Sequence, residues 1–253
     1  SPNVVCIRSW DWGIGEKWQF PVIIDNMMNL EMLMWSADYS GQAEFREISI
    51  SHADNTLENH YRDDYSCYHV VDYDSMSGDV LNRRTWQGAT DSSSWARGQA
   101  WGLYGFTMMY RMSEKDSYLE RAINIADFLL DHANMPEDHI PYWDYNAPNI
   151  PDEERDASAA AIIASALIEL STFTEGEKSE KFLLAAERML LSLSSSEYLA
   201  GKGENGHFIL KHSVGAKPFG SEVDVPLTYA DYYFVEALLR YMKLKETEKE
   251  EQS

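Results

Sequence analysis

Hydrophobic positions recur at helical spacing through most of the chain. After Pro21, apolar residues repeat every three or four positions until Ser40 and Gly41, which is the spacing of a helix with one buried face. Six further segments show the same period, and aromatic or Gly-rich connections separate several of them. Seven helices are therefore expected, over residues 22–40, 43–61, 94–112, 117–134, 156–173, 179–193 and 228–243.

The expected helices are of two kinds that alternate along the chain. Those that begin near residues 23, 94, 156 and 228 carry few charges, so we expect them to be buried on most sides. The intervening helices are amphipathic, as an outer layer requires. This repeat, about 60 to 70 residues long, indicates helical hairpins that lean on their neighbours. The prediction is an all-α fold, an (α/α)6 toroid of helical hairpins.

Seven helices are too few for the six hairpins of a complete toroid, so we expect an incomplete barrel that lacks N-terminal helices. In domain terms, residues 1–245 are expected to be the C-terminal portion of a single (α/α)6 barrel domain. Residues 246–253 are expected to form a charged tail that frays. The long connections 66–93, 135–155 and 197–227 are expected at one end of the ring, where a cleft would be built.

Charge and composition exclude several classes of function. Lys and Arg number 21 and Asp and Glu 42, giving a formal net charge of −21 that repels nucleic acid. No apolar run approaches the roughly 20 residues of a membrane span, so no membrane partner is expected. Neither Cys6 nor Cys67 lies in a metal or redox motif, and the seven histidines show no metal-binding spacing. We therefore expect neither a metal nor a cofactor.

Aromatic residues make up 13% of the chain, and several of its eight tryptophans stand beside polar residues. Such tryptophans are compatible with a sugar-binding cleft, in which flat rings stack on pyranose faces, and equally with half-buried packing residues. The sequence has no nucleophile elbow and no phosphate-binding glycine loop. Carboxylate acid/base chemistry is therefore the expected kind of catalysis.

Asp25 is the first candidate because it stands in apolar surroundings near the start of the first expected helix. It could be a first-turn acid that the helix dipole favours. Alternatively it could be a proton donor, provided that burial or a second carboxylate raises its pKa. His69 lies between aromatic residues, where it could titrate near neutral pH or be a buried structural histidine.

Residues 85–104 form the densest group of candidates. Arg97, Trp101 and Tyr104 are spaced i, i+4, i+7 and are expected to share one helix face. A guanidinium one turn from an indole suits a ligand with both a carboxylate and a flat sugar face. In the alternative interpretation, Arg97 pairs with Asp91 or a loop carbonyl and the aromatic rings belong to the core.

Several motifs resemble the unsaturated glucuronyl hydrolases of glycoside hydrolase family 88. They are FPVIIDNMMNLEMLMWSA, SCYHVVDYD, TWQGATDSSSWARGQAWGLYGF and the stretch YWDYNAP…RDASAAAI, and the similarity runs from Trp10 to about Lys243. The resemblance implies an (α/α)6 barrel that removes a 4,5-unsaturated uronic acid from the non-reducing end of lyase-generated oligosaccharides. The expected partner is thus an unsaturated uronate-containing oligosaccharide of glycosaminoglycan type, in the periplasm or cytoplasm of a bacterium.

The resemblance also implies roles for individual residues. Asp25 matches the family's general acid and base, which protonates C4 of the enol ether and assists water at C5. His69 and Gln87 match positions near the reacting ring and its water, and Trp10 matches an aromatic residue that packs on the sugar. The expected catalytic residues are thus Asp25, His69 and Gln87, and the expected substrate-binding residues are Trp10, Thr85, Trp95, Arg97, Trp101 and Tyr104.

One departure from the family pattern concerns a second essential Asp, in a D-x-G-F-type motif upstream of the Trp10 loop. That motif does not occur in this sequence. If the second Asp raises the pKa of Asp25, the chain is expected to be weakly active or inactive. Two alternatives stay open: an unsaturated rhamnogalacturonyl hydrolase of pectin breakdown, and a catalytically dead helical-repeat scaffold. Sulfation and linkage preference and oligomeric state are left open by the sequence.

Overall fold

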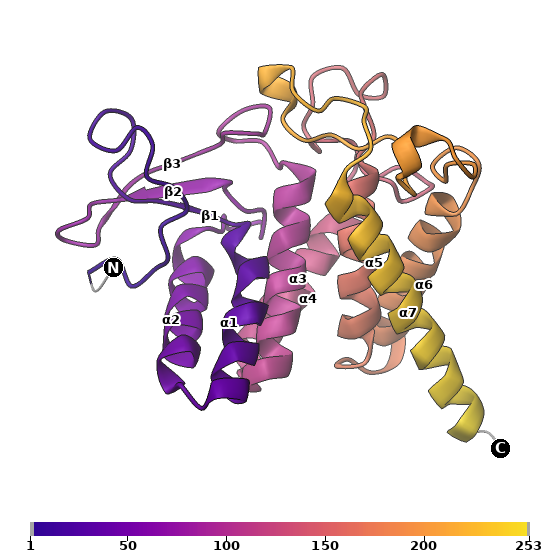
Figure 1. Cartoon of the computed structure of the whole chain (residues 1–253), viewed down its shortest axis with the longest axis horizontal. Coiled ribbons are helices and arrows are strands. Elements are labelled where there is room, and N and C mark those ends of the chain that lie inside the picture. Colours follow the sequence, from indigo (N-terminus) through magenta and orange to yellow (C-terminus); the bar gives the residue numbers. More distant parts are fainter. Residues whose placement is uncertain (1–2, 252–253) are drawn as a thin grey trace. The chain divides into compact units, whose positions relative to one another are not determined.

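Seven α-helices and one three-stranded sheet form within residues 3–251, the part of the chain that the computed structural model describes (Figure 1). The chain divides into two units, Ser1–Phe128 and Leu129–Ser253, which are described separately. The seven helices lie close to the seven expected segments. The helices that begin at Ala96 and Ala157 are buried along most of their length, as expected, whereas those that begin at Asn26 and Thr228 expose much of their surface, in contrast to the expectation. The sheet is an addition that the sequence analysis did not predict.

The first unit begins with an antiparallel sheet of β1 (Pro21–Ile23), β2 (Val70–Tyr73) and β3 (Val80–Arg84), in the order β1-β2-β3. Residues 22–25 were expected to be helical and residues 66–93 to be a loop. The apolar run after Pro21 pairs instead with Val70 and Val71, so this segment is extended. One face of the sheet packs on a small core that comprises Val4, Cys6, Phe20, Val22, Val71 and Tyr73.

The helices of the first unit follow from the pattern of apolar positions. α1 (Asn26–Ser40) and α2 (Ala43–Asn59) form a hairpin, and Gly41, at φ 71°, adopts the left-handed conformation that ends α1. α3 (Ala96–Ser113) is buried along most of its length, and α4 (Asp116–Leu130) follows after a short turn. The predicted two-residue connection between the first two helices is confirmed.

Three glycines on one face of α3 let it approach the start of α1 closely. A Cβ atom at Gly98 would collide with the ring of Trp95, and one at Gly105 would collide with Met27 of α1. A Cβ atom at Gly102, between them, would collide with the hydroxyl of Tyr61 and would touch Ile24, directly before Asp25. Because these positions carry no side chain, the first turns of α3 pack against the residues that carry Asp25.

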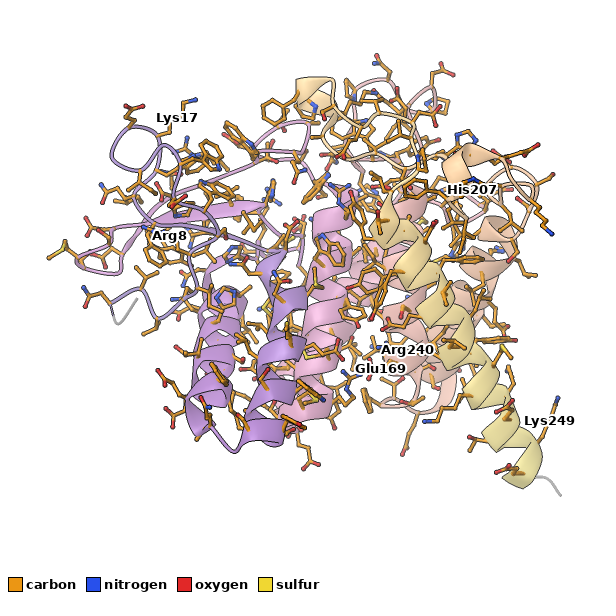
Figure 2. All side chains as sticks on the ribbon, in the orientation of Figure 1. Arg8, Lys17, Glu169, His207, Arg240 and Lys249 are labelled. Carbon is orange, nitrogen blue, oxygen red and sulfur yellow. The ribbon has the colours of Figure 1, made fainter. Side chains whose placement is uncertain are left out.

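The second unit is built around α5 (Ala157–Ser171), which packs against both α6 (Gly176–Leu193) and α7 (Thr228–Glu251). Two short 3-10 turns, Asn205–His207 and Lys217–Phe219, interrupt the connection before α7. Asp156 caps α5 by accepting from the backbone N–H groups of Ser158 and Ala159, so it is the plain N-terminal acid that its position favours. Figure 2 shows Arg240 of α7 beside Glu169 of α5, and the Nη1–Oε2 distance is 2.7 Å.

α7 is longer than expected. The sequence analysis ended this helix at Lys243, but the structure continues it through Glu251, so residues 246–251 do not form a frayed tail. Lys and Glu are strong helix formers and neither Gly nor Pro interrupts the segment, which accounts for the extension. Lys245 also lies 3.4 Å from Glu187 of α6. Residues 252 and 253 of the expected tail lie outside the described residues.

Two helices carry exposed apolar stripes. On α1 the stripe consists of Met32, Trp35 and Tyr39, and the last two rings stack with their centroids 5.1 Å apart. On α7 the stripe runs at helical spacing through Tyr232, Val235, Leu239 and Met242.

Candidate active site

The register of the sheet brings Asp25 and His69 together. Ile23, the last residue of β1, pairs with Val70, the first residue of β2. One residue further on, the backbone N–H of Ile24 donates to the carbonyl of His69 at 3.0 Å. The end of β1 and the start of β2 are therefore neighbours, and Oδ2 of Asp25 lies 3.7 Å from Nε2 of His69.

His69 is held as a neutral ring by its neighbours. Its Nδ1 accepts from the backbone N–H groups of Trp86 and Gln87, each at 3.1 Å, so the ring proton is placed on Nε2 and faces Asp25. Burial, followed by the charge of Arg97, lowers the pKa of His69 to about 3. The ring does not titrate near neutral pH, in contrast to one of the two possibilities that the sequence left open.

Asp25 occupies the N-cap position of α1, but its side chain makes no capping hydrogen bond. The side chain is 22% exposed. Burial raises its pKa to about 6, although the charge of Arg97, its own backbone N–H and a hydrogen bond from Trp101 each act to lower the pKa. Among the described residues, Oδ2 has no hydrogen-bond partner, and neither has Nε2 of His69. A proton donor and an acceptor thus face a common point without bonding to each other.

Arg97 and Trp101 lie one turn apart at the start of α3, and both act on Asp25, as their shared helix face predicts. The guanidinium of Arg97 is buried and lies 4.5 Å from the centroid of the Trp95 ring. Trp95 in turn packs against His69, with centroids 4.5 Å apart. These side chains therefore form one continuous buried group around the carboxylate.

Tyr104, a predicted site residue, contacts a different part of α1 from Asp25. Its hydroxyl donates to Oε2 of Glu31 at 3.0 Å, and Glu31 lies on α1 well beyond its first turn. Residues seven apart on a helix share a face but are separated by about 10 Å along the axis. The shared face was predicted correctly, but Tyr104 lies too far along it.

The loop after β3 holds the backbone donors that fix His69. Oγ1 of Thr85 accepts from the N–H of Gly88 at 2.7 Å, and the Thr85 N–H donates to Oδ1 of Asp91 at 2.8 Å. Arg62 adds a hydrogen bond to the carbonyl of Asp91. These bonds close the turn that aims the N–H groups of Trp86 and Gln87 at His69, so Thr85 and Gln87 both lie beside the candidate site.

Trp10 lies in a cluster of four tryptophans, which we name the tryptophan platform: Trp10, Trp12, Trp18 and Trp86. The rings of Trp10 and Trp12 stack with centroids 5.2 Å apart and an interplanar angle of 12°. Trp86 belongs both to this platform and, through its backbone N–H, to the support of His69. Trp12 and Trp86 are among the tryptophans that stand beside polar residues, but the family resemblance assigned a sugar-packing role only to Trp10.

Two features were missed, one with a local signal in the sequence and one without. The glycines of α3 stand at i, i+4 and i+7, a spacing that could have indicated close packing of two helices. The grouping of the platform depends on β3, which was not predicted, and no local pattern links residues 10–18 to Trp86.

Within residues 3–251, no group of three His, Cys, Asp or Glu side chains is arranged so that it could hold a metal ion. No helix in this range is long and apolar enough to cross a membrane.

The comparisons with known proteins agree on one family. No protein-family model matches the chain. A curated unsaturated glucuronyl hydrolase from Formosa agariphila is 48% identical over 242 residues, which cover 96% of this chain and 60% of the relative. Another from Bacillus sp. strain GL1 is 35% identical and is matched over 93% of this chain and 65% of its own length.

Solved structures give the same result. The crystal structure of an unsaturated glucuronyl hydrolase specific for heparin matches 96% of this chain and 64% of that chain, with 53% identity and a TM-score of 0.93. The solved relatives are (α/α)6 barrels, which confirms the predicted fold class. The chain spans about 60% of the length of the curated relatives it matches. Over nearly its whole length the chain is similar in sequence and fold to unsaturated glucuronyl hydrolases, the enzymes of glycoside hydrolase family 88.

Proposed function

We propose that the protein hydrates the C4–C5 double bond of a 4,5-unsaturated uronic acid at the non-reducing end of lyase-generated glycosaminoglycan oligosaccharides. The observation that carries the proposal is the Asp25 carboxyl group, which has a pKa of about 6 and an unbonded oxygen 3.7 Å from a neutral histidine. A general acid and base works best with a pKa close to the working pH. Similarity to the unsaturated glucuronyl hydrolases supports the reaction class, and the geometry around Asp25 supports the choice of residues.

In the proposed reaction Asp25 acts twice. Its protonated carboxyl group gives a proton to C4, which removes the double bond and leaves the positive charge at C5. The resulting carboxylate then accepts a proton from the water that bonds to C5, so Asp25 returns to its starting state. The product is a hemiketal whose ring opens and releases the next sugar. One carboxyl group with a pKa of about 6 is suited to both steps because it exchanges its proton readily near neutral pH.

Arg97 is the proposed anchor for the uronate carboxylate. It is buried, its charge acts on Asp25, and a guanidinium binds a carboxylate through two parallel hydrogen bonds. In the free protein its charge lowers the pKa of Asp25. A bound uronate would neutralise that charge, so substrate binding itself would favour the protonated form of Asp25 that the first step needs.

His69 is proposed to donate from Nε2–H to the Asp25 carboxylate or to the reacting water, and not to act as a base. Its Nδ1 already accepts two backbone hydrogen bonds, and its pKa of about 3 keeps the ring neutral. Gln87 is proposed to contact the same water, because its backbone N–H places it beside His69. Trp101 would orient Asp25 through its hydrogen bond, and Trp10, Thr85 and Trp95 would line the sugar site.

The curated relatives favour glycosaminoglycan substrates over the pectin alternative. Three streptococcal relatives are named unsaturated chondroitin disaccharide hydrolases, and each is 32% identical to this chain. A solved relative is named as specific for heparin. We propose an unsaturated glycosaminoglycan disaccharide or longer oligosaccharide as the substrate, with no metal or cofactor taking part.

The test follows the ultraviolet absorbance of the 4,5 double bond. The parent chain and its Asp25→Asn variant are incubated with unsaturated chondroitin and heparin disaccharides and with an unsaturated rhamnogalacturonan disaccharide. We expect the absorbance to decay with the parent chain on a glycosaminoglycan substrate and to persist with the variant. Decay on the rhamnogalacturonan substrate alone would favour the pectin alternative. No decay from a folded parent sample would overturn the proposal for this chain and favour the binding scaffold.

A further inference from the structure

The tryptophan platform adjoins the candidate active site but contributes only Trp10 to the predicted sugar site. Its connection to that site is Trp86, whose backbone N–H donates to His69 while its ring lies 5.2 Å from the ring of Trp12. Trp12 then stacks on Trp10. The platform is therefore linked to His69 through the backbone of Trp86 and to the predicted sugar site through Trp10.

Burial differs sharply within the platform. Trp18 is 2% exposed and packs edge-on against its three neighbours, so it is the structural base of the cluster. Trp12 is 44% exposed although it also contacts three rings, those of Trp10, Trp18 and Trp86. If the cluster only filled the protein interior, a buried ring such as that of Trp18 would be sufficient. An indole that is supported by other indoles and still exposes nearly half its surface provides a rigid apolar face for a ligand.

The charge around the platform is opposite to the charge of the chain. The segments 8–18 and 83–86 carry four cationic side chains against two acidic ones, whereas the whole chain has twice as many acidic residues as basic ones. The Lys17 ammonium lies 5.9 Å from the Trp86 ring centroid, and the Arg84 guanidinium lies 4.4 Å from that of Trp18. Lys17 and Arg8, both on the segment that carries Trp10 and Trp12, are labelled in Figure 2.

We propose that the platform is a binding subsite for an anionic sugar unit beyond the terminal disaccharide, with Trp12 and Trp86 stacking on the sugar and Lys17 pairing with its sulfate or carboxylate. The inference rests on the proposed function for the identity of the ligand, an acidic oligosaccharide. It adds a preference for chains longer than a disaccharide. A flat ring beside a mobile ammonium group suits a repeating glycan in which apolar sugar faces alternate with acidic groups.

The first experiment compares unsaturated chondroitin disaccharide and tetrasaccharide as substrates of the parent chain and of Trp12→Ala. Trp35→Ala is the matched control, because Trp35 is 57% exposed, stacks on one aromatic neighbour and lies on the outer stripe of α1. We expect kcat/KM for the tetrasaccharide to fall about tenfold in Trp12→Ala, equivalent to about 1.4 kcal/mol, while the disaccharide value changes by less than about twofold. Equal losses on both substrates, or an equal effect of Trp35→Ala, would overturn the proposal.

The second experiment measures binding without catalysis, so the subsite and the proposed reaction can fail separately. A saturated chondroitin sulfate tetrasaccharide, which has no double bond to hydrate, is titrated while tryptophan fluorescence is followed. We expect saturable quenching with the parent chain and weaker binding of the sulfated tetrasaccharide by Lys17→Ala. If Lys17 recognises sulfate, the same variant should bind an unsulfated hyaluronan tetrasaccharide about as well as the parent chain does. Equal weakening of both ligands would assign Lys17 to the carboxylate that they share.

Two outcomes are decisive. Saturable binding without any hydrolysis would refute the proposed reaction and leave the subsite standing. Hydrolysis of the disaccharide with no tetrasaccharide binding by the parent chain, or with binding that neither Trp12→Ala nor Lys17→Ala weakens, would refute the subsite. Lys17→Ala changes an exposed side chain, so it keeps the test valid even if Trp12→Ala fails to fold.

Discussion

Asp25→Asn is expected to stabilise the protein at neutral pH while abolishing its proposed activity. Burial raises the pKa of Asp25 from 3.8 to about 6, so between these values the folded chain holds a proton that the unfolded chain has released. Stability therefore falls as pH rises through this window, and the loss is complete above about pH 6. The carboxylate thus destabilises the folded protein at the pH where it is proposed to work.

The magnitude follows from the shift in pKa. At about 1.36 kcal/mol per pKa unit, the ionised group costs about 3 kcal/mol at pH 7.5 and about half of that at pH 5. Asn has nearly the same shape and no charge at either pH. The free energy of unfolding of Asp25→Asn should therefore exceed that of the parent by about 3 kcal/mol at pH 7.5, and by about half as much at pH 5.

The assay is urea unfolding followed by tryptophan fluorescence at the two pH values. Seven of the eight tryptophans lie in residues 1–128, so the signal reports mainly on the unit that contains Asp25. Asp63→Asn, at an exposed position, controls for the general relief of negative charge and should change stability by less than about 0.5 kcal/mol. Asp72→Asn is the opposite control, because its buried carboxylate accepts from the backbone N–H groups of Gln19 and Phe20. That variant should be destabilised.

The reasoning is refuted if Asp25→Asn is no more stable than the parent at pH 7.5. It is also refuted if the gain is the same at both pH values, because the predicted gain depends on ionisation. Gains of equal size in Asp25→Asn and Asp63→Asn would assign the effect to the net charge of −21 and not to the burial of one carboxylate.

Three further changes have defined outcomes. Trp101→Phe removes a hydrogen bond that lowers the pKa of Asp25, so the fall of kcat/KM with rising pH should move to higher pH; an unmoved pH profile would contradict this. Gly105→Ala would place a methyl group against Met27 and should lower the free energy of unfolding by about 1–3 kcal/mol in urea titrations. Burial lowers the pKa of His52 to about 3, so stability should decline as pH falls below the unfolded value of about 6.5, and calorimetry should find a shallower decline in His52→Gln.

The helices could be predicted from the sequence because each one carries its own periodic signal. The sheet could not, because β1 is too short to show a period and its partner β2 is nearly fifty residues away. Val22, Ile23 and Ile24 are compatible with a helix or a strand until that partner is known. The predicted start of the first helix was wrong for this reason, and Asp25 lies at the junction of strand and helix instead of inside a helix.

In the candidate site, too, features set by local helical geometry were predicted and features set by distant segments were not. Arg97 and Trp101 were placed on one face because helical geometry alone determines it. The neutral state of His69 depends on two backbone donors from a loop whose position is set by β3, so the residues around His69 in the sequence gave no indication of it. Tyr104 was included in the site because its helical spacing puts it on the same face as Arg97. Helical spacing does not show how far along the helix axis the site extends.

The apolar stripes of α1 and α7 have a consequence for the colloidal behaviour of the protein. Copies that carry 21 net negative charges repel one another over the Debye length, which is about 30 Å at 0.01 M salt and about 3 Å at 1 M. The stripes exert their attraction only at contact. Added salt should therefore reduce the range of the repulsion while leaving the contact attraction in place. Light scattering should then show association that increases with sodium chloride. If the molecules are dispersed in dilute buffer, charge repulsion is the expected cause, because the exposed stripes themselves favour contact.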